Sequence, residues 1–408
     1  MMRDLRVLFV PCSNAGVSYY RQWLWNVAAC RNRAFLSLMP WFQYEMNTTH
    51  PWEVDLADPR HAARIKNELW SHFLRCDAVV FQMVHTKPAL DLFLAMKEAA
   101  QDSRLQSLRE NQGISDGVPP VILAEIDDNM LSTADYNPAA AFYNPGSEYR
   151  QLAVEQFKSA DGMIVSTRYL ADEVYRDTNP DISVVHNSID FEVWNRVRKK
   201  SNGKIVRIGW MGGASHDEDL RIVEPVVKSI LAKHKNVRFT FVHGAPEFLK
   251  NIPGVEIVSK FSRIDRYPQF LGNRGFDIGI APLVDNAFNR GKSNLRWLEY
   301  AGMQVPCVAS NVGHFKETLR NGEDALLADS PADFEAALES LILDRNKRKA
   351  LGQSAYRRAL QDFNVDRNIF VYEKILRDAV ERGQKKIYQP EYAAPIAEER
   401  ISAPGVYS

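Results

Sequence analysis

A cation and a carboxylate stand seven positions apart in the stretch 289–310, NRGKSNLRWLEYAGMQVPCVAS. Its pattern predicts a short helix over 294–302 with Ser293 as the N-cap. Lys292 then stands at the helix start and Glu299 nearly two turns further on, about 10 Å along the axis. Helix starts bind phosphate, and a carboxylate accepts two hydrogen bonds from a ribose diol. The spacing therefore favours a ligand with a diphosphate at one end and a sugar diol at the other.

A glycine turn in GWMGGASHDEDL (209–220) offers a second approach to phosphate. Gly212 and Gly213 end an expected strand and open a helix, so backbone N–H groups can approach a pyrophosphate. His216 in this turn is either a phosphate donor or a structural residue. Two loops, 241–245 and 261–265, should flank a nucleotide base. The donor-binding candidates are Gly212, Gly213, His216, His243, Gly244, Arg263, Gly291, Lys292, Ser293, Asn294, Leu295 and Glu299.

Three carboxylates follow the apolar run 120–126: Glu125 at its end, then Asp127 and Asp128. At the carboxyl edge of a strand they can contact a hydroxyl nucleophile; alternatively, they only begin the next turn. Paired carboxylates can also hold Mn²⁺ or Mg²⁺. Because lysine and a helix start already supply positive charge for a diphosphate, we expect no metal and no other cofactor.

The loop after the first strand reads NAGVSYYR, residues 14–21. Gly16 lets the chain pass the floor of a cleft, and Tyr20 and Arg21 begin the next helix. We expect all three, together with Asp128, on the acceptor side of a site. Arg21 can equally be an ordinary exposed cation.

The elements that must hold these residues are short apolar strands separated by helical patterns. This alternation predicts an α/β fold of two Rossmann-like parallel-sheet domains facing a cleft. The predicted strands are 5–10, 77–84, 120–126, 161–166 and 182–186, then 205–211, 237–243, 255–259, 276–283, 305–310 and 324–328. The predicted parts are an acceptor-side domain 1–194, a linker 195–204, a donor domain 205–362, a helix 363–382 returning to the first domain, and an irregular tail 383–408.

Bulk properties narrow the class of protein. The 408 residues suit two domains, and 51 basic against 51 acidic residues give no net charge and no strong nucleic-acid signal. Four cysteines lack CxxC pairing, which argues against a zinc site or disulfide framework and favours the cytoplasm. No stretch is apolar enough to span a membrane. The segment 19–33 is a modest candidate for peripheral membrane contact.

The sequence resembles the GT-B nucleotide-sugar glycosyltransferases, specifically the retaining Glu–seven residues–Glu family (group 1, or family 4, type). LEYAGMQVPCVAS resembles the second half of that motif, with Glu299 as its second glutamate. Gly291 replaces the first glutamate, and the arginine usual after the first glycine turn is missing. Asp127 falls where relatives carry a residue beside the reaction centre. Further resembling segments, in family order, are 14–21, 159–174, 184–194 and 209–220.

The resemblance implies transfer of a sugar from a UDP- or GDP-type donor to an acceptor hydroxyl, with retention. Asp127, Lys292 and Glu299 are then the catalytic candidates. The acceptor hydroxyl stays open among saccharide, lipid, protein and a modified nucleobase. Two alternatives also stay open: a nucleotide-sugar epimerase or phosphorylase of the same fold, and a non-catalytic carbohydrate-binding relative.

Overall fold

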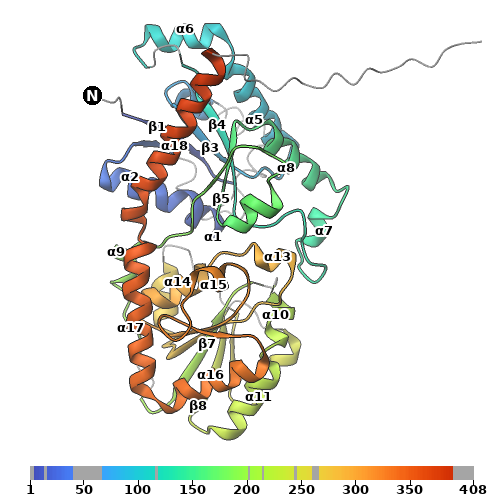
Figure 1. The fold of residues 1–408 in the computed structure, drawn as a ribbon, viewed down its shortest axis with the longest axis vertical. Coiled ribbons are helices and arrows are strands. Elements are labelled where there is room, and N and C mark those ends of the chain that lie inside the picture. The colour runs from blue at the N-terminus through green and yellow to red at the C-terminus, as the bar shows by residue number, and fades with distance from the viewer. Residues whose placement is uncertain are drawn as a thin grey trace, which may run out of the picture.

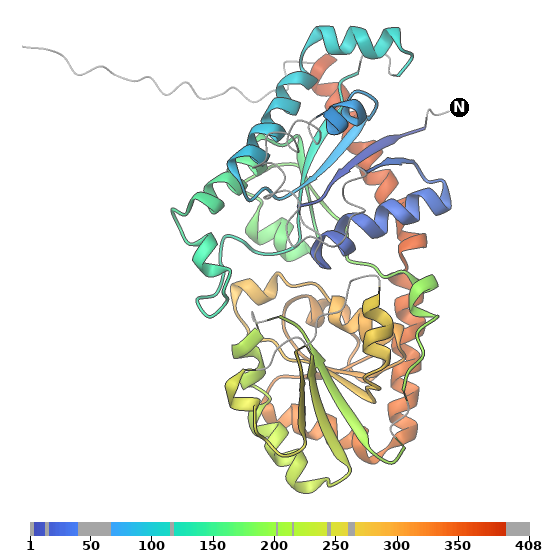
Figure 2. The ribbon, with the colours of Figure 1, turned by 180° about the vertical axis from the view of Figure 1, so that it is seen from behind.

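Two α/β lobes are stacked along the long axis of the molecule in a computed structural model (Figure 1). The structure describes residues 4–12, 16–39, 67–114, 118–200, 203–213, 216–242, 246–259 and 266–388. Each lobe contains one parallel sheet with helices packed on it, seen from the other side in Figure 2. The predicted fold class is confirmed.

The first lobe contains a six-stranded sheet in the order β2-β1-β3-β4-β5-β6. Every residue of β3 and β4 is buried, which agrees with their largely apolar sequences AVVFQ and VILAEI; the polar exceptions, Gln82 and Glu125, are buried as well. The order 2-1-3-4-5 leaves a crevice where the chain changes direction, between β1 and β3. The strands are β1 Arg6–Val10, β2 Leu36–Leu38, β3 Ala78–Gln82, β4 Val121–Ile126, β5 Gly162–Val165 and β6 Ile182–Val184.

The second lobe has a six-stranded sheet in the order β12-β11-β10-β7-β8-β9. Numbered within this lobe and read from the other edge, the order is 3-2-1-4-5-6, that of dinucleotide-binding folds, with its crevice between β7 and β10. The strands are β7 Val206–Met211, β8 Val237–Val242, β9 Val255–Val258, β10 Ile278–Ala281, β11 Cys307–Ser310 and β12 Leu326–Ala328.

Helices cover both sheets. Those of the first lobe are α1 Gly16–Ser18, the π-helical turn η1 Tyr19–Trp23, α2 Leu24–Asn32, α5 Lys87–Ala100, α6 Ser103–Asn111, α7 Ala140–Tyr143, α8 Glu148–Ser159, the π-helical turn η3 Leu170–Val174 and α9 Phe191–Trp194. Those that follow are α10 Asp217–Arg221, α11 Glu224–Lys233, the 3₁₀ turn η5 Glu247–Leu249, α12 Tyr267–Gly272, α13 Ala287–Arg290, α14 Leu295–Gly302, α15 Gly313–Thr318, α16 Pro331–Leu343, α17 Arg345–Asp362 and α18 Val365–Tyr388.

The last helix, α18, returns along the side of the first lobe (Figure 1). The Tyr372 ring lies edge-on to Trp25, with centroids 5.0 Å apart, and near Phe9 at 6.2 Å. Further along, Arg382 forms a two-bond ion pair with Asp181 at 2.8 and 2.9 Å. The core of the first lobe is therefore completed by residues from the end of the chain.

Three features of the fold differ from the sequence predictions: a short strand, the end of the last helix and the linker. The short strand β2 was not predicted, because three residues are too few to show periodicity. Helix α18 continues to Tyr388, so the irregular tail does not begin at 383; residues 389–408 lie outside the described part. The predicted linker is held to the second lobe, since Lys200 N donates to Gly272 O at 2.9 Å.

Candidate functional site

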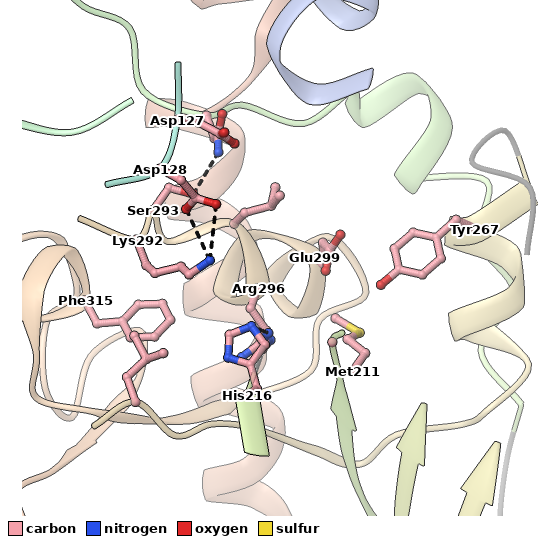
Figure 3. A pocket seen from close by; sticks show the side chains of 14 residues that line it. Asp127, Asp128, Met211, His216, Tyr267, Lys292, Ser293, Arg296, Glu299 and Phe315 are labelled. Atoms are coloured by element: carbon pink, nitrogen blue, oxygen red, sulfur yellow. Dashed lines mark hydrogen bonds and ion pairs between the residues drawn. The ribbon is translucent and has the colours of Figure 1, made fainter. Parts of the chain in front are cut away.

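A cavity of about 220 Å³ lies between the lobes, and residues from both line it (Figure 3). The second lobe contributes the end of β7 and the segment around α14, and the first contributes the turn after β4. This places the cavity beside the crevice between β7 and β10. Its described lining residues are Asp127, Asp128, Asn187, Met211, Gly212, His216, Tyr267, Leu283, Lys292, Ser293, Leu295, Arg296, Glu299 and Phe315.

Lys292 lies in the loop between α13 and α14, and its side chain reaches across to the first lobe. Its Nζ is 3.2 Å from Asp128 Oδ1 and 4.5 Å from the centroid of the Phe288 ring. Because Lys292 precedes the helix, the rise of 1.5 Å per residue does not set its distance from Glu299. Both side chains nevertheless face the same cavity (Figure 3).

The N-cap of α14 is Asn294, not Ser293 as the sequence predicted. The Ser293 hydroxyl instead accepts a hydrogen bond from Asn187 Nδ2 of the first lobe, at 2.7 Å. Asn294 is fully buried, and its Nδ2 is 3.4 Å from Thr318 Oγ1. The first backbone N–H groups of α14, including that of Leu295, have no acceptor within the helix. The helix start thus presents partial positive charge beside the cavity.

Glu299 is 6% exposed and accepts a hydrogen bond from the Tyr20 hydroxyl at 2.7 Å. Tyr20 was expected on the acceptor side, but it contacts the second lobe, carried there by the π-helical turn η1. Burial raises the pKa of Glu299 to about 7, although the Tyr20 hydrogen bond and the Arg296 charge act in the opposite direction. An incoming diol would therefore meet a carboxylate poised between its two protonation states.

Arg296 is the site residue that the sequence reasoning missed. Its guanidinium lies 5.2 Å from the Trp210 ring centroid, and a nitrogen is 3.1 Å from His216 Nε2. A Cβ at Gly212 would be 2.7 Å from that group, so Gly212 makes room for it. Among the described residues, no carboxylate forms an ion pair with Arg296. Its i, i+3 spacing from Glu299 was the signal that could have placed it on the same helix face.

His216 holds Arg296 in place. Its Nδ1 is 2.7 Å from Asp219 Oδ2, and burial, followed by the charge of Arg296, lowers its pKa to about 4. The ring is therefore neutral, with Nδ1–H donating to Asp219 and Nε2 accepting from Arg296. The expectation that His216 donates to a phosphate is thus replaced by a positioning role, because both ring nitrogens are already engaged.

Asp219 connects this group to the first lobe. Its Oδ1 accepts hydrogen bonds from Val284 N and Asn289 Nδ2, both at 2.8 Å. Asn289 and Asn286 in turn lie 3.3 and 2.9 Å from the Tyr136 hydroxyl, in the segment after β4. A continuous polar path therefore runs from Tyr136 to Arg296.

Gly291, where the resemblance to the Glu–seven residues–Glu family would place a glutamate, packs against the first lobe. A Cβ there would lie 2.8 Å from Leu170 Cδ2 and 3.3 Å from Asn129 Cβ. Its carbonyl oxygen is 3.3 Å from Thr167 Oγ1. A longer side chain at this position would therefore require the Leu170 side chain to move.

Arg21 is not among the described residues that line the inter-lobe cavity. It is 1% exposed, and its Nε is 2.6 Å from Glu125 Oε1, while another nitrogen donates to Val185 O and Asn187 Oδ1. Neither the acceptor contact nor the exposed cation expected from the sequence describes it. Arg21 instead neutralises Glu125 and positions Asn187 beneath the site.

Asp127 stands at the junction of the site with a second cavity. Burial, and then the neighbouring carboxylates of Asp128 and Glu125, raise its pKa to about 7. Asp128 pairs with Lys292 across the lobes. The two aspartates and Lys292 line both cavities, so this is where a group could pass from one ligand to another.

The remaining candidates are less engaged. Gly16 begins α1, and Gly213 follows the Gly212 turn; a Cβ at either would meet nothing within 4 Å. His243, Gly244 and Arg263 lie outside the described residues. In the described part of the chain, no cluster of three or more His, Cys, Asp or Glu side chains is arranged to hold a metal ion. No helix there has the length and hydropathy needed to cross a membrane.

Known structures share this architecture. HepE from Anabaena in complex with UDP and glucose is 13% identical, with a TM-score of 0.57 over 94% of this chain and 100% of HepE. A glycosyltransferase from Rickettsia africae is 15% identical (TM-score 0.55; 95% and 100% covered). Sucrose-phosphate synthase from Thermosynechococcus elongatus is 12% identical (TM-score 0.55; 96% and 100% covered). The chain therefore has the GT-B fold.

Part of the second lobe, after β7 and α10, and the start of α18 match a family model. Residues 222–373 match the model described as glycosyl transferase-like. That match contains α14 and most of the cavity lining from the second lobe. Comparison with curated proteins gives no significant match.

Proposed function

We propose that this protein is a glycosyltransferase that moves a sugar from a nucleotide diphosphate to an acceptor hydroxyl. The observation that carries the proposal is the inter-lobe cavity, where Lys292, Arg296 and Glu299 face Asp127 and Asp128. Two cations with the start of α14 suit a diphosphate, and a buried carboxylate suits a ribose diol. The glycosyl transferase-like match and the GT-B fold support this proposal.

The nucleotide should lie with its ribose on Glu299 and its phosphates toward Arg296 and Lys292. Glu299 has one oxygen bonded to Tyr20, so its other oxygen and the remaining lone pairs are available to the diol. Arg296 presents a planar fork of donors that can bind a phosphate with two hydrogen bonds. Its guanidinium is already fixed by Trp210 and His216, so little side-chain entropy is lost on binding.

Lys292 is proposed to act on the leaving group. As the glycosidic bond breaks, negative charge grows on the diphosphate, and a nearby cation lowers the barrier most if it meets that charge. Lys292 is paired with Asp128. Donor binding would therefore exchange a carboxylate for a phosphate as its partner and release Asp128 toward the acceptor side.

We propose retention at the anomeric carbon because the motif around Glu299 resembles that of a retaining family. Asp127, next to the proposed reaction centre, is the side chain placed to contact the transferred sugar or the incoming hydroxyl. The ¹H NMR spectrum of fresh product, whose anomeric coupling reports configuration directly, tests this. A product with inverted configuration would contradict retention but would still agree with sugar transfer.

The nucleotide is proposed to be uridine diphosphate, since HepE was solved with UDP and with UDP-glucose. Calorimetric titration with UDP, GDP and ADP tests the choice of nucleotide, and release of nucleotide from the matching sugar donors tests turnover.

Glu299→Gln should weaken the binding of uridine, UMP and UDP alike, by about 1.5 to 3 kcal/mol, because all three carry the diol. The control is Lys316→Gln, which removes the charge of an exposed lysine on α15.

Absence of binding by all three nucleotides would overturn the proposal. Conversion of a nucleotide-sugar to its epimer without any acceptor would favour the epimerase alternative instead. Nucleotide binding without release from any donor would favour a non-catalytic relative.

A further inference from the structure

A second cavity, of about 270 Å³, opens beside the first and is lined mainly by the amino-terminal lobe, with Phe288 and Lys292 from the second lobe. It lies at the carboxyl ends of β1, β3 and β4, next to the crevice between β1 and β3. The two cavities meet at Asp127, Asp128 and Lys292.

One wall of this second cavity is apolar. Val17, Met83, Ile126, Met130 and Phe288 line it, and they come from both lobes. Methionine side chains adapt to irregular shapes, and aliphatic and aromatic groups remove apolar ligand surface from water. The wall therefore suits one apolar face of a flat or chair-shaped ring.

The lining also offers uncharged hydrogen-bonding groups. Asn137 is 4% exposed, and its Oδ1 accepts from Ala139 N at 3.0 Å, whereas its Nδ2 has no partner among the described residues. Thr133 Oγ1 is buried and also lacks a partner in the described part of the chain. Buried polar atoms without partners, such as Thr133 Oγ1, are rare, and both Thr133 and Asn137 line the cavity.

Acidic side chains outnumber basic ones where the two cavities meet. Asp127 and Asp128 stand there with Lys292, which is the only lysine or arginine among the described lining residues; His85 also lines the cavity, with its Nδ1 2.8 Å from the Tyr143 hydroxyl. Lys292 already pairs with Asp128 and is also the proposed partner of the donor diphosphate. Asp127, whose pKa is raised to about 7, is partly ionised near neutral pH. A phosphate or carboxylate on an acceptor would therefore meet two acidic groups and no further lysine or arginine, which disfavours it in a partly buried site.

We propose that this cavity is the acceptor subsite and that it selects an uncharged hydroxylated ring with one apolar face. The acceptor hydroxyl lies toward Asp127, the apolar face lies on Met83 and Met130, and Asn137 Nδ2 donates to a second oxygen of the ring. The inference rests on the proposed transferase function and narrows its acceptor to compounds without a phosphate or carboxylate on this ring. A saccharide unit and an aromatic alcohol share this chemistry.

Nucleotide release from the UDP-sugar that binds most tightly should be measured with matched acceptor pairs. Methyl glucoside against glucose 6-phosphate tests the saccharide source, and 4-(hydroxymethyl)phenol against 4-(hydroxymethyl)benzoate tests the aromatic source. At least one uncharged member should raise release at least tenfold over its anionic partner. Preference for either anionic member, or no stimulation by any uncharged ring while UDP still binds, would overturn the inference.

Asn137→Asp isolates the proposed contact. It keeps the oxygen that accepts from Ala139 N and replaces the free donor by a carboxylate oxygen of nearly the same shape. The kcat/KM for the acceptor should fall at least tenfold, while UDP affinity stays within twofold. Asn144→Asp, the same change at an exposed position after α7, should match the wild type. An unchanged kcat/KM in Asn137→Asp would contradict the contact between Asn137 and the acceptor. Failure of the wild type to bind UDP would instead contradict the transferase function itself.

Discussion

Replacing Arg296 by methionine should remove most of the affinity for the diphosphate while sparing the nucleoside. Methionine keeps a long apolar stem against Trp210 but has no charge and no N–H donors. A hydrogen bond to a charged group contributes about 1.5 to 3 kcal/mol, which corresponds to a loss of roughly 10- to 150-fold in UDP affinity. Uridine, which lacks phosphate, should bind the variant as it binds the wild type.

The same substitution has a second consequence that does not depend on ligand. The charge of Arg296 helps to hold the pKa of His216 at about 4, after burial, so its removal should raise that pKa toward 6.5. A pH titration of the His216 ring by NMR would show the change. Arg296→Lys should recover part of the UDP affinity but not all, since an ammonium cannot form the two-bond fork.

Calorimetry with uridine, UMP and UDP measures the first effect. Arg320→Met is the control, because that side chain is 61% exposed and lies away from the cavity lining. If UDP binds Arg296→Met within twofold of the wild type, the assignment of Arg296 to the diphosphate is refuted. If uridine is weakened as much as UDP, Arg296 only supports the local fold.

Three further outcomes follow from the geometry. Burial raises the pKa of Glu299 to about 7, above its ordinary 4.5, and the diol favours the carboxylate; uridine affinity should therefore rise about tenfold from pH 6 to pH 8, and calorimetry should show no such rise in Glu299→Gln. Lys292→Ala should lower the rate of donor cleavage more than donor affinity, and equal losses in steady-state kinetics would place the lysine on ground-state binding alone. UDP should bind equally with and without excess EDTA, and a drop above tenfold would make Asp127 and Asp128 metal ligands.

Much of the architecture follows from local sequence patterns. All eleven predicted strands occur, because buried parallel strands are continuous apolar runs that need no knowledge of their neighbours. The start of α14 was placed one residue too early, since both Ser293 and Asn294 are good N-cap residues. Strand β2 escaped prediction because it is held by pairing with β1 rather than by its own sequence.

The site was less accessible, because its side chains are set by contacts between distant segments. The sequence indicates Lys292 and Glu299, but not that Tyr20 would bond to Glu299 from 279 positions away. Arg21 looks like any surface arginine until the fold buries it against Glu125. Arg296 also looks like an ordinary exposed cation in the sequence of its helix. Only the fold shows that the glycine turn at Gly212 gives its side chain room in the cavity.

The path of α18 also sets the order in which the molecule can be completed during synthesis. Ile369 and Leu376 are fully buried, and Tyr372 covers Trp25, so the first lobe keeps an open apolar surface until α18 leaves the ribosome. At about 5 to 20 residues per second, the chain between α9 and α18 takes roughly ten to thirty seconds to make. The second lobe, whose strands all precede α18, can close its own sheet during that interval. The lobe that begins the sequence is therefore the last to be finished.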